Sequence, residues 1–117
     1  MPFTVDIVLP CFNPNDTWHR ELLMFYETGK KYYLLNFIVV NDGSTNTKVS
    51  NQIEALKSKE VPVTYIEYPV NKGKGYALRQ GVAKSSAEFV VCTDIDFPFT
   101  TQSMLDLMEA LCEKTYD

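Results

Sequence analysis

The stretch "FIVVNDGSTN", residues 37–46, decides the class of fold because it passes from an apolar run into a polar turn. Its first residues continue a longer run of Leu, Ile, Val and Phe, which is typical of a strand buried on both faces of a parallel sheet. Gly43 permits a sharp turn, and Ser44 or Thr45 can cap a following helix. The stretch therefore predicts a strand over residues 34–41, then a turn, then a helix.

The rest of the chain repeats this alternation of strand and helix. Three further runs rich in Val, Ile, Phe and Tyr predict strands over residues 4–10, 61–68 and 87–94. The order βαβαβαβα predicts an α/β, doubly wound sheet with right-handed crossovers, in which the second and fourth strands are central. The residues at helical spacing are Trp18, Leu22 and Phe25, ended by Gly29; Val49, Ile53 and Leu56; Leu78 and Val82; and, after Thr100 or Thr101, Met104, Leu107, Met108 and Leu111.

Composition excludes several classes of function. The 117 residues fit one domain, and 11 Lys and Arg against 15 Asp and Glu give a net charge of −4, which disfavours nucleic acid as a partner. Cys11, Cys92 and Cys112 are far apart, with one His in the chain, so we predict buried thiols in a reducing cytoplasm rather than disulfides or a zinc site. No signal peptide is predicted, and no apolar run approaches the ~20 residues of a membrane span.

Polar residues gather where three predicted strands end: "PCFN" at 10–13, "NDGST" at 41–45 and "TDID" at 93–96. Ligands of doubly wound sheets bind beyond this edge. Asp94 and Asp96 point the same way in an extended segment, and two adjacent carboxylates repel unless a cation lies between them. Hard oxygen ligands suit Mg²⁺ or Mn²⁺, so a metal site is predicted, with a helix-capping or turn pair as the alternative.

The segment "NKGKGYALRQG", residues 71–81, places Lys72, Lys74 and Arg79 around two glycines at a predicted helix start. Free backbone N–H groups and nearby cations suit a diphosphate, although the spacing is not that of a Walker A loop. A solvated loop is the alternative. Asp42 can accept hydrogen bonds from a base or ribose, or can belong to a plain strand-turn-helix corner.

In this order, "VDIVLPCFN", "FIVVNDGSTN", "NKGKGYALRQG" and "EFVVCTDIDF" resemble the nucleotide-sugar-binding half of the family 2 glycosyltransferases. The resemblance covers nearly all of residues 1–117. It implies a Rossmann-like GT-A fold, with an open, mainly parallel sheet and flanking helices, truncated so that the acceptor-binding half is absent. It also implies that the general base lies outside this chain, which would then bind the donor without turnover.

The resemblance assigns roles to individual residues. Phe12 would lie against the base, Asp42 would hydrogen-bond the base edge, and Lys74 and Arg79 would face the phosphates. The family often has two acids where this chain has Asn41 and Asp42, and an acid after its first motif, for which Asp16 is a candidate here. The implied nucleotide-binding residues are Pro10, Phe12, Asp42, Lys74, Arg79 and Asp94, and the implied ligands of Mn²⁺ or Mg²⁺ are Asp94 and Asp96.

The function implied by the resemblance is inverting, metal-dependent transfer of a sugar from UDP or GDP to an acceptor. "TDIDFPFT" with "GKGYALRQG" is similar to dolichyl-phosphate mannose or glucose synthases, so a polyprenyl phosphate or a glycan is the expected acceptor. The longer protein could work at the inner face of the cell membrane, and the cut sheet predicts self-association. The alternatives are a non-catalytic nucleotide-binding module and a nucleotidyltransferase, although the latter normally has a glycine-rich basic loop where this chain has "PCFNPND".

Overall fold

The computed structural model describes residues 3–95, 102, 104–106 and 108–110. Within this part of the chain, four parallel strands form one sheet in the order β3-β2-β1-β4. The strands are β1 (Thr4–Cys11), β2 (Leu34–Asp42), β3 (Val63–Tyr68) and β4 (Phe89–Cys92), and the helices are α1 (Trp18–Gly29), α2 (Val49–Ser58) and α3 (Lys74–Ala83).

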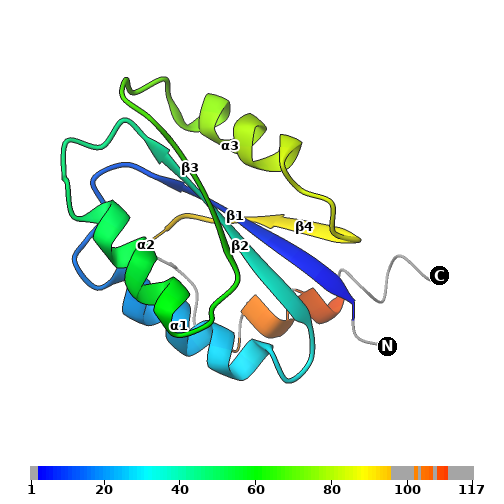
Figure 1. The fold of residues 1–117 in the computed structure, drawn as a ribbon. Coiled ribbons are helices and arrows are strands. Elements are labelled where there is room, and N and C mark those ends of the chain that lie inside the picture. The colour runs from blue at the N-terminus through cyan, green and yellow to red at the C-terminus, as the bar shows by residue number, and fades with distance from the viewer. Residues whose placement is uncertain (1–2, 96–101, 103, 107, 111–117) are drawn as a thin grey trace.

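Helices cover both faces of the sheet (Figure 1). The helices α1 and α2 lie on one face together with the helical residues near 104–110, and α3 lies on the other. This arrangement confirms the predicted α/β, doubly wound architecture. No helix within the described ranges has both the length and the apolar character that crossing a membrane requires.

The strand order reverses beside β1. The chain proceeds outward from β1 to β2 and β3, and then returns past both strands to place β4 on the free side of β1. The prediction that the second strand is central is therefore confirmed, whereas the prediction for the fourth is wrong, because among the described residues β4 pairs with β1 alone. Its apolar run includes Phe89 and Val91, which are buried in the core.

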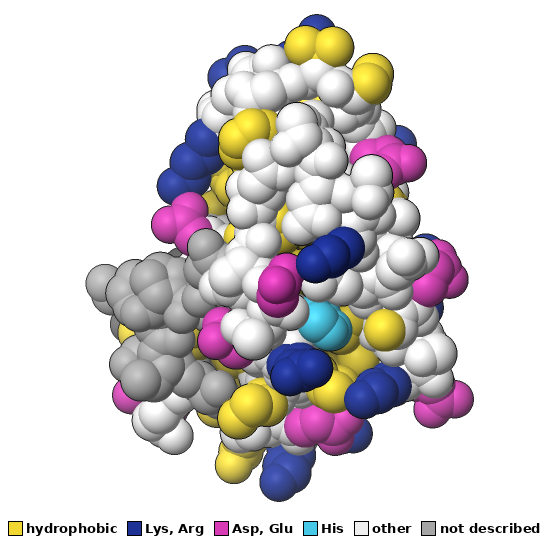
Figure 2. Space-filling model, turned by 90° about the vertical axis from the view of Figure 1, so that its left-hand side faces the viewer, with side chains coloured by type: hydrophobic (Ala, Val, Ile, Leu, Met, Phe, Trp, Pro, Cys, Tyr) yellow, Lys and Arg dark blue, Asp and Glu magenta, His cyan; other side chains and the backbone are white. Residues whose placement is uncertain are grey.

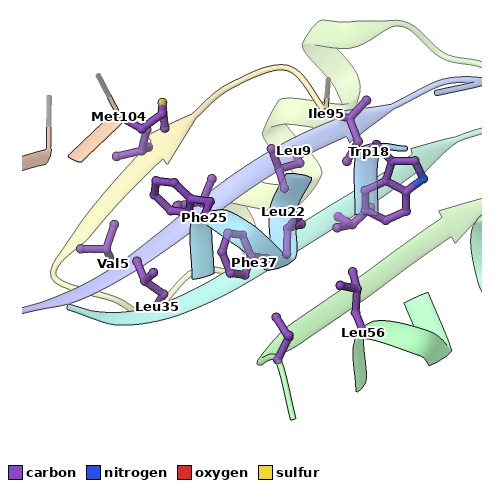
Figure 3. Close-up of a cluster of buried hydrophobic side chains, with 14 of the residues drawn as sticks. Val5, Leu9, Trp18, Leu22, Phe25, Leu35, Phe37, Leu56, Ile95 and Met104 are labelled. Atoms are coloured by element: carbon purple, nitrogen blue, oxygen red, sulfur yellow. The ribbon is translucent and has the colours of Figure 1, made fainter. Parts of the chain in front are cut away.

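The larger core lies between the sheet and α1 and α2. Figure 3 shows Phe25 of α1 and Phe37 of β2 in this core. Their rings pack edge to face, with the ring centroids 6.1 Å apart. Each such buried side chain stabilises the fold by roughly 1.5–3 kcal/mol. The predicted stripes Trp18, Leu22, Phe25 and Gly29, and Val49, Ile53 and Leu56, are buried as expected, as are Met104 and Met108. Leu107 and Leu111 lie outside the described residues.

The smaller core lies under α3, and its composition corrects a prediction. The face that α3 buries carries Ala77 and Gly81, whereas Leu78 is half-buried and Val82 is exposed. A Cβ atom on Gly81 would lie 2.3 Å from Cγ1 of Val8 on β1. The helix therefore lies so close to the sheet that only small residues fit between them, and small residues give no hydrophobic stripe in the sequence.

A buried aspartate ties the end of α3 to the sheet. Asp6 of β1 is 6 % exposed, and its Oδ2 accepts hydrogen bonds from the hydroxyl of Ser85 at 2.6 Å and from the backbone N–H groups of Ser86 and Ala87. Its Oδ1 accepts one from Asn36 at 3.3 Å. Several donors thus offset the cost of burying this charge.

The cysteines only partly follow their prediction. Cys11 is buried at the end of β1, as expected. Cys92 is exposed, contrary to the prediction, because it ends β4, an edge strand of the described sheet. The partial burial that remains raises the pKa of its thiol. Cys112 lies outside the described residues.

Candidate nucleotide-binding site

A cavity of about 420 Å³ opens at the edge of the sheet where the strands end. This volume is within the range of small-molecule pockets, about 300–1,000 Å³. The ends of β1 and β4 flank the point at which the strand order reverses, where doubly wound sheets bind ligands. The cavity brings together residues of all four sequence motifs: Pro10, Cys11, Phe12, Asp42, Asn71, Gly73, Lys74 and Asp94.

Asp42, at the end of β2, holds the loop that precedes α3. Its Oδ1 accepts a hydrogen bond from the N–H of Lys72 at 2.8 Å, and its Oδ2 accepts one from the N–H of Gly73 and one from the side-chain amide of Asn71, both at 3.0 Å. Asn71 also donates to the Asp42 carbonyl at 3.1 Å. Asp42 is only 3 % exposed. Most of its hydrogen-bonding capacity is therefore used to position this loop.

Gly43 allows this loop to approach the end of β2. Its φ of +68° confirms the sharp turn predicted from the sequence. A Cβ atom at this position would lie 2.3 Å from the backbone nitrogen of Asn71 and 2.6 Å from the carbonyl carbon of Val70. The turn after β2 and the loop before α3 therefore touch backbone to backbone, which leaves no room for a side chain.

Asn13 fastens the loop after β1 to the loop after β2. Its Oδ1 accepts hydrogen bonds from the N–H and hydroxyl of Thr45, at 3.0 and 3.2 Å, and from the N–H of Asn46 at 3.1 Å. Its own N–H donates to Oγ of Ser44 at 2.9 Å. The sequence predicted that Ser44 or Thr45 would cap α2. This prediction is wrong, because that helix begins later, at Val49. The positive φ of Asn13, 46°, is one that asparagine adopts more readily than most residues.

Asn41 is also engaged within the protein. Its amide nitrogen donates to the hydroxyl of Tyr65 at 2.9 Å, its Oδ1 accepts from the N–H of Ser44, and the Tyr65 hydroxyl donates to Glu67 at 2.9 Å. Burial, helped by the bond to Glu67, raises the pKa of Tyr65 to about 12. Asn41 thus joins β2 to β3.

Tyr68 lies behind the Asp42 carboxylate. Its hydroxyl is buried and makes no hydrogen bond of good geometry to the described residues. Burial, followed by the interaction of its hydroxyl with the Asp42 carboxylate and then by the charge of that carboxylate, raises the pKa of Tyr68, so it stays a neutral phenol at physiological pH. The ring meets that of Tyr76 edge to face at 5.3 Å, and Nζ of Lys72 lies 5.4 Å from the Tyr76 ring centre.

Phe12 is the aromatic residue of the cavity. It directly follows β1 and is 51 % exposed, although large apolar residues are usually buried. A half-exposed ring beside polar groups offers a flat apolar surface to a planar ligand. Pro10, which also lines the cavity, is half-buried.

An ion pair joins the start of α3 to the end of β4. Nζ of Lys74 lies 2.7 Å from Oδ1 of Asp94, and the two side chains are 63 % and 55 % exposed. A pair this exposed contributes about 0–1 kcal/mol to stability, so it does not hold the fold together. Asp96, the second predicted metal ligand, lies outside the described residues. Within those residues, no three His, Cys, Asp or Glu side chains come together as a metal site.

Two predicted residues are not among the described residues that line the cavity. The guanidinium of Arg79 lies back along α3, 3.5 Å from where a Cβ on Gly75 would be. Asp16 is 73 % exposed and lies 3.8 Å from Nζ of Lys48. Of the basic residues near the glycines, Lys74 is thus the one that the cavity includes.

The histidine lies on the side of the molecule where the strands end. Figure 1 shows the strands ending on the left, and Figure 2 turns that side to the viewer, where the single His, His19, lies among Lys, Arg, Asp and Glu side chains. Burial, then the positive charges of Arg20 and Lys59, lower its pKa. Its Nδ1 is buried without a hydrogen-bond partner among the described residues, so His19 is expected to stay neutral at physiological pH.

Comparisons with known proteins agree with this geometry. The sequence model of glycosyl transferase family 2 matches residues 6–117. A poly-β-1,6-N-acetyl-D-glucosamine synthase of Staphylococcus epidermidis is 28 % identical over 92 residues, which cover 79 % of this chain and 21 % of the synthase. The chain thus spans about a fifth of the length of the curated relatives that it matches.

Two solved structures show the same fold. A Pyrobaculum calidifontis mannosyltransferase, in complex with GDP-Man and Mn²⁺, is 24 % identical, with a TM-score of 0.69 over 82 % of this chain and 28 % of its own. Glucosyl-3-phosphoglycerate synthase of Mycobacterium tuberculosis, in complex with Mn²⁺, UDP and phosphoglyceric acid, is 26 % identical, with a TM-score of 0.58 over 79 % of this chain and 32 % of its own. The resemblance read from the sequence is thereby confirmed: the chain belongs to glycosyl transferase family 2 and has the GT-A fold.

Proposed function

We propose that this chain binds the nucleotide-sugar donor of a family 2 glycosyltransferase in the cavity at the carboxyl edge of the sheet. One observation carries the proposal: an exposed aromatic ring, a buried carboxylate, a lysine and an exposed carboxylate, drawn from four separate motifs, line one cavity. These groups match the parts of a nucleotide sugar, which has a flat base, polar base and ribose edges, and a charged diphosphate. The four residues are Phe12, Asp42, Lys74 and Asp94.

Each residue has a distinct role in this proposal. Phe12 stacks on the base, Asp42 meets the base edge, and Lys74 faces the diphosphate. Asp94, with Asp96, would hold Mn²⁺ or Mg²⁺, which suits carboxylate oxygens and neutralises the charge of the leaving diphosphate. The Mn²⁺ in the complexes of the Mycobacterium tuberculosis synthase and the Pyrobaculum calidifontis mannosyltransferase supports this choice of cofactor.

The hydrogen bonds of Asp42 favour uracil over guanine. A carboxylate offers about four acceptor positions, and the bonds from Asn71, Lys72 and Gly73 use three of them. The position left on Oδ1 suits the single N–H on the pairing edge of uracil, whereas guanine presents a ring N–H beside an amino group. The solved relatives contain both nucleotides, UDP in the Mycobacterium tuberculosis synthase and GDP-Man in the Pyrobaculum calidifontis mannosyltransferase, so this preference rests on Asp42 alone. We therefore infer a UDP-sugar donor.

The chemistry of the longer protein follows from this donor site. We propose inverting transfer to a glycan or to a polyprenyl phosphate, with the general base and the acceptor site outside this chain and the enzyme at the inner face of the cell membrane. The similarity to a poly-β-1,6-N-acetyl-D-glucosamine synthase supports the glycan. The isolated chain would then bind the donor without turnover. Its self-association stays a prediction, which sedimentation velocity would test.

Isothermal titration calorimetry tests the donor site. We expect UDP to bind more tightly than GDP or ADP, and more tightly with Mn²⁺ than without it. Replacing the predicted metal ligands, Asp94→Ala with Asp96→Ala, should abolish the effect of Mn²⁺. A control, Asp16→Ala with Glu21→Ala, removes the same charge outside the cavity and should retain that effect.

Three outcomes would contradict parts of the proposal. If Mn²⁺ does not strengthen UDP binding in the parent, the metal role is wrong. If ADP binds as well as UDP, the chain is a general nucleotide-binding module. If the double variant of Asp94 and Asp96 keeps the full effect of Mn²⁺, the metal lies elsewhere.

A further inference from the structure

We propose that Lys74 holds Asp94 while the donor is absent, and that the divalent cation displaces it when the donor binds. Lys74 then turns to the diphosphate, so that one side chain couples the binding of cation and nucleotide. This inference rests on the proposed function, because it takes a diphosphate and a divalent cation as the ligands of the cavity.

The ion pair occupies the place that the cation needs. Oδ1 of Asp94 lies 2.7 Å from Nζ of Lys74, and both residues line the cavity. A metal ion binds a carboxylate oxygen at about 2.0–2.6 Å, so an ammonium and a metal ion at the same oxygen would repel each other at close range. A cation that binds Oδ1 of Asp94 therefore requires Lys74 to move away.

The geometry makes this movement easy. Both side chains are more than half exposed, so the ion pair is weak and solvent replaces it at little cost. Lys74 is the first residue of α3. The N–H of the residue before it, Gly73, donates a hydrogen bond to the Asp42 carboxylate. The backbone of Lys74 is thus fixed at the cavity, while its flexible aliphatic side chain lets the ammonium group change partners.

The neighbouring basic residues lack this arrangement. Nζ of Lys72 lies over the ring of Tyr76, and the guanidinium of Arg79 lies along α3 near Gly75. Among these three basic residues, the exchange is therefore a property of Lys74, and Lys72 provides a matched control of equal charge in the same loop.

The exchange predicts mutual strengthening of the two ligands. Without nucleotide, the cation competes with Lys74 and binds weakly. A bound diphosphate gives Lys74 another anionic partner and so releases Asp94. Because coupling between two ligands is reciprocal, the cation must strengthen nucleotide binding by the same factor.

Substitution of Lys74 in this chain should move the two affinities in opposite directions. We expect Lys74→Gln to bind Mn²⁺ about two- to fivefold more tightly in the absence of nucleotide, as measured by electron paramagnetic resonance. It should bind UDP about tenfold more weakly in calorimetry without metal, because a charge-assisted contact is lost. Mn²⁺ should also improve its UDP affinity by a smaller factor than in the parent.

Two further variants separate the exchange from a general effect of charge. Lys72→Gln removes the same charge but should leave both affinities within about twofold of the parent, since it leaves the pair with Asp94 intact. Lys74→Arg keeps a cation beside Asp94 and should retain the parent's Mn²⁺ affinity. Circular dichroism and urea unfolding should show all three variants folded, because the substituted residues are exposed.

The outcomes distinguish this inference from the proposed function. If the parent binds UDP and Mn²⁺ but Lys74→Gln leaves the Mn²⁺ affinity unchanged or weaker, or matches Lys72→Gln, the exchange is wrong and the donor site stands. If the parent binds neither UDP nor Mn²⁺, the proposed function fails and the exchange fails with it.

Discussion

At each end of α3, a buried aspartate of the sheet accepts hydrogen bonds from the adjoining loop, but the two ends face different cavities. At the amino end, Asp42 of β2 binds the loop over residues 71–73, and at the carboxyl end, Asp6 of β1 binds the loop over residues 85–87. Both carboxylates are buried. Each also lines a cavity, of about 420 Å³ at the carboxyl edge of the sheet and about 390 Å³ at the amino edge.

The difference lies in the groups around each aspartate. The carboxyl edge adds an exposed aromatic ring, Phe12, and an exposed pair of opposite charges, Lys74 and Asp94. The cavity at the amino edge adds Lys84 with small, polar and aliphatic residues, and no aromatic ring is among the described residues that line it. A buried carboxylate and an open volume are therefore compatible with a purely structural role. Exposed groups suited to a ligand distinguish the proposed donor site.

The largest effect on stability should come from a side chain that pushes α3 away from the sheet. Gly81→Val places a side chain where a Cβ atom would already lie 2.3 Å from Val8, so we expect a loss of about 3 kcal/mol or more of unfolding free energy, measured by urea denaturation. Gly75→Ala is the control, since its nearest neighbour is the flexible end of Arg79 at 3.5 Å. If the valine variant is as stable as the parent, α3 does not pack as described.

The two aspartates should differ in function but not in stability. Asp6→Ala and Asp42→Ala each leave several donors unpaired, so each should lose about 2 kcal/mol of unfolding free energy. Only Asp42→Ala should also weaken UDP binding, measured by calorimetry at a temperature at which both variants are folded. Equal losses of UDP affinity in the two variants would show that UDP binding depends on how α3 is positioned and not on direct contact with Asp42.

A smaller effect should distinguish exposed aromatic residues at the two edges. Phe12→Ala should reduce UDP affinity about tenfold, because stacking on a base contributes about 1–3 kcal/mol, while the melting temperature changes little at a residue that is 51 % exposed. Tyr32→Ala removes a ring that is 61 % exposed just before β2, at the amino edge, and should leave UDP affinity unchanged. A similar loss in both variants would mean that Phe12 does not contact the base.

The smallest effect should be a pH response from His19 of α1, which does not line the proposed donor site. The pKa of His19 is lower in the folded chain than its usual 6.5, so its protonation favours the unfolded chain. Its contribution to stability is complete above pH 6.5 and is lost as the pH falls toward the folded pKa. Thermal melts at pH 7.5 and 5.5 should show a smaller decrease for His19→Gln than for the parent. An equal decrease would assign the pH response to other groups.

Much of the fold was predictable from the sequence because hydrophobic spacing reports which faces are buried. The stripe of Trp18, Leu22 and Phe25 gave the packing of α1 correctly. The buried face of α3 was missed because Ala77 and Gly81 carry little apolar surface, and close approach to the sheet depends on that absence. The position of β4 at the edge of the described sheet was missed because a strand can be apolar from burial in the core without a neighbour on each side.

The candidate site was predictable where a residue lies at or just after the end of a strand, or at the start of α3. Pro10, Phe12, Asp42, Lys74 and Asp94 do line one cavity, although their binding roles remain predictions. The contributions of Asn13 and Asn71 were missed, because each joins loops far apart in the sequence through side-chain bonds to backbone groups. Local pattern does not encode such bonds. The asparagine directly after Phe12, a residue type that tolerates positive φ, was the one signal available.

Gly43 has a consequence for any attempt to alter the proposed donor preference by mutagenesis. Because its backbone touches that of Val70 and Asn71, any side chain there would displace the loop whose N–H groups bind Asp42. A combinatorial library around the cavity should therefore keep residue 43 as glycine. It can vary residue 70, whose side chain is 62 % exposed, without disturbing that contact.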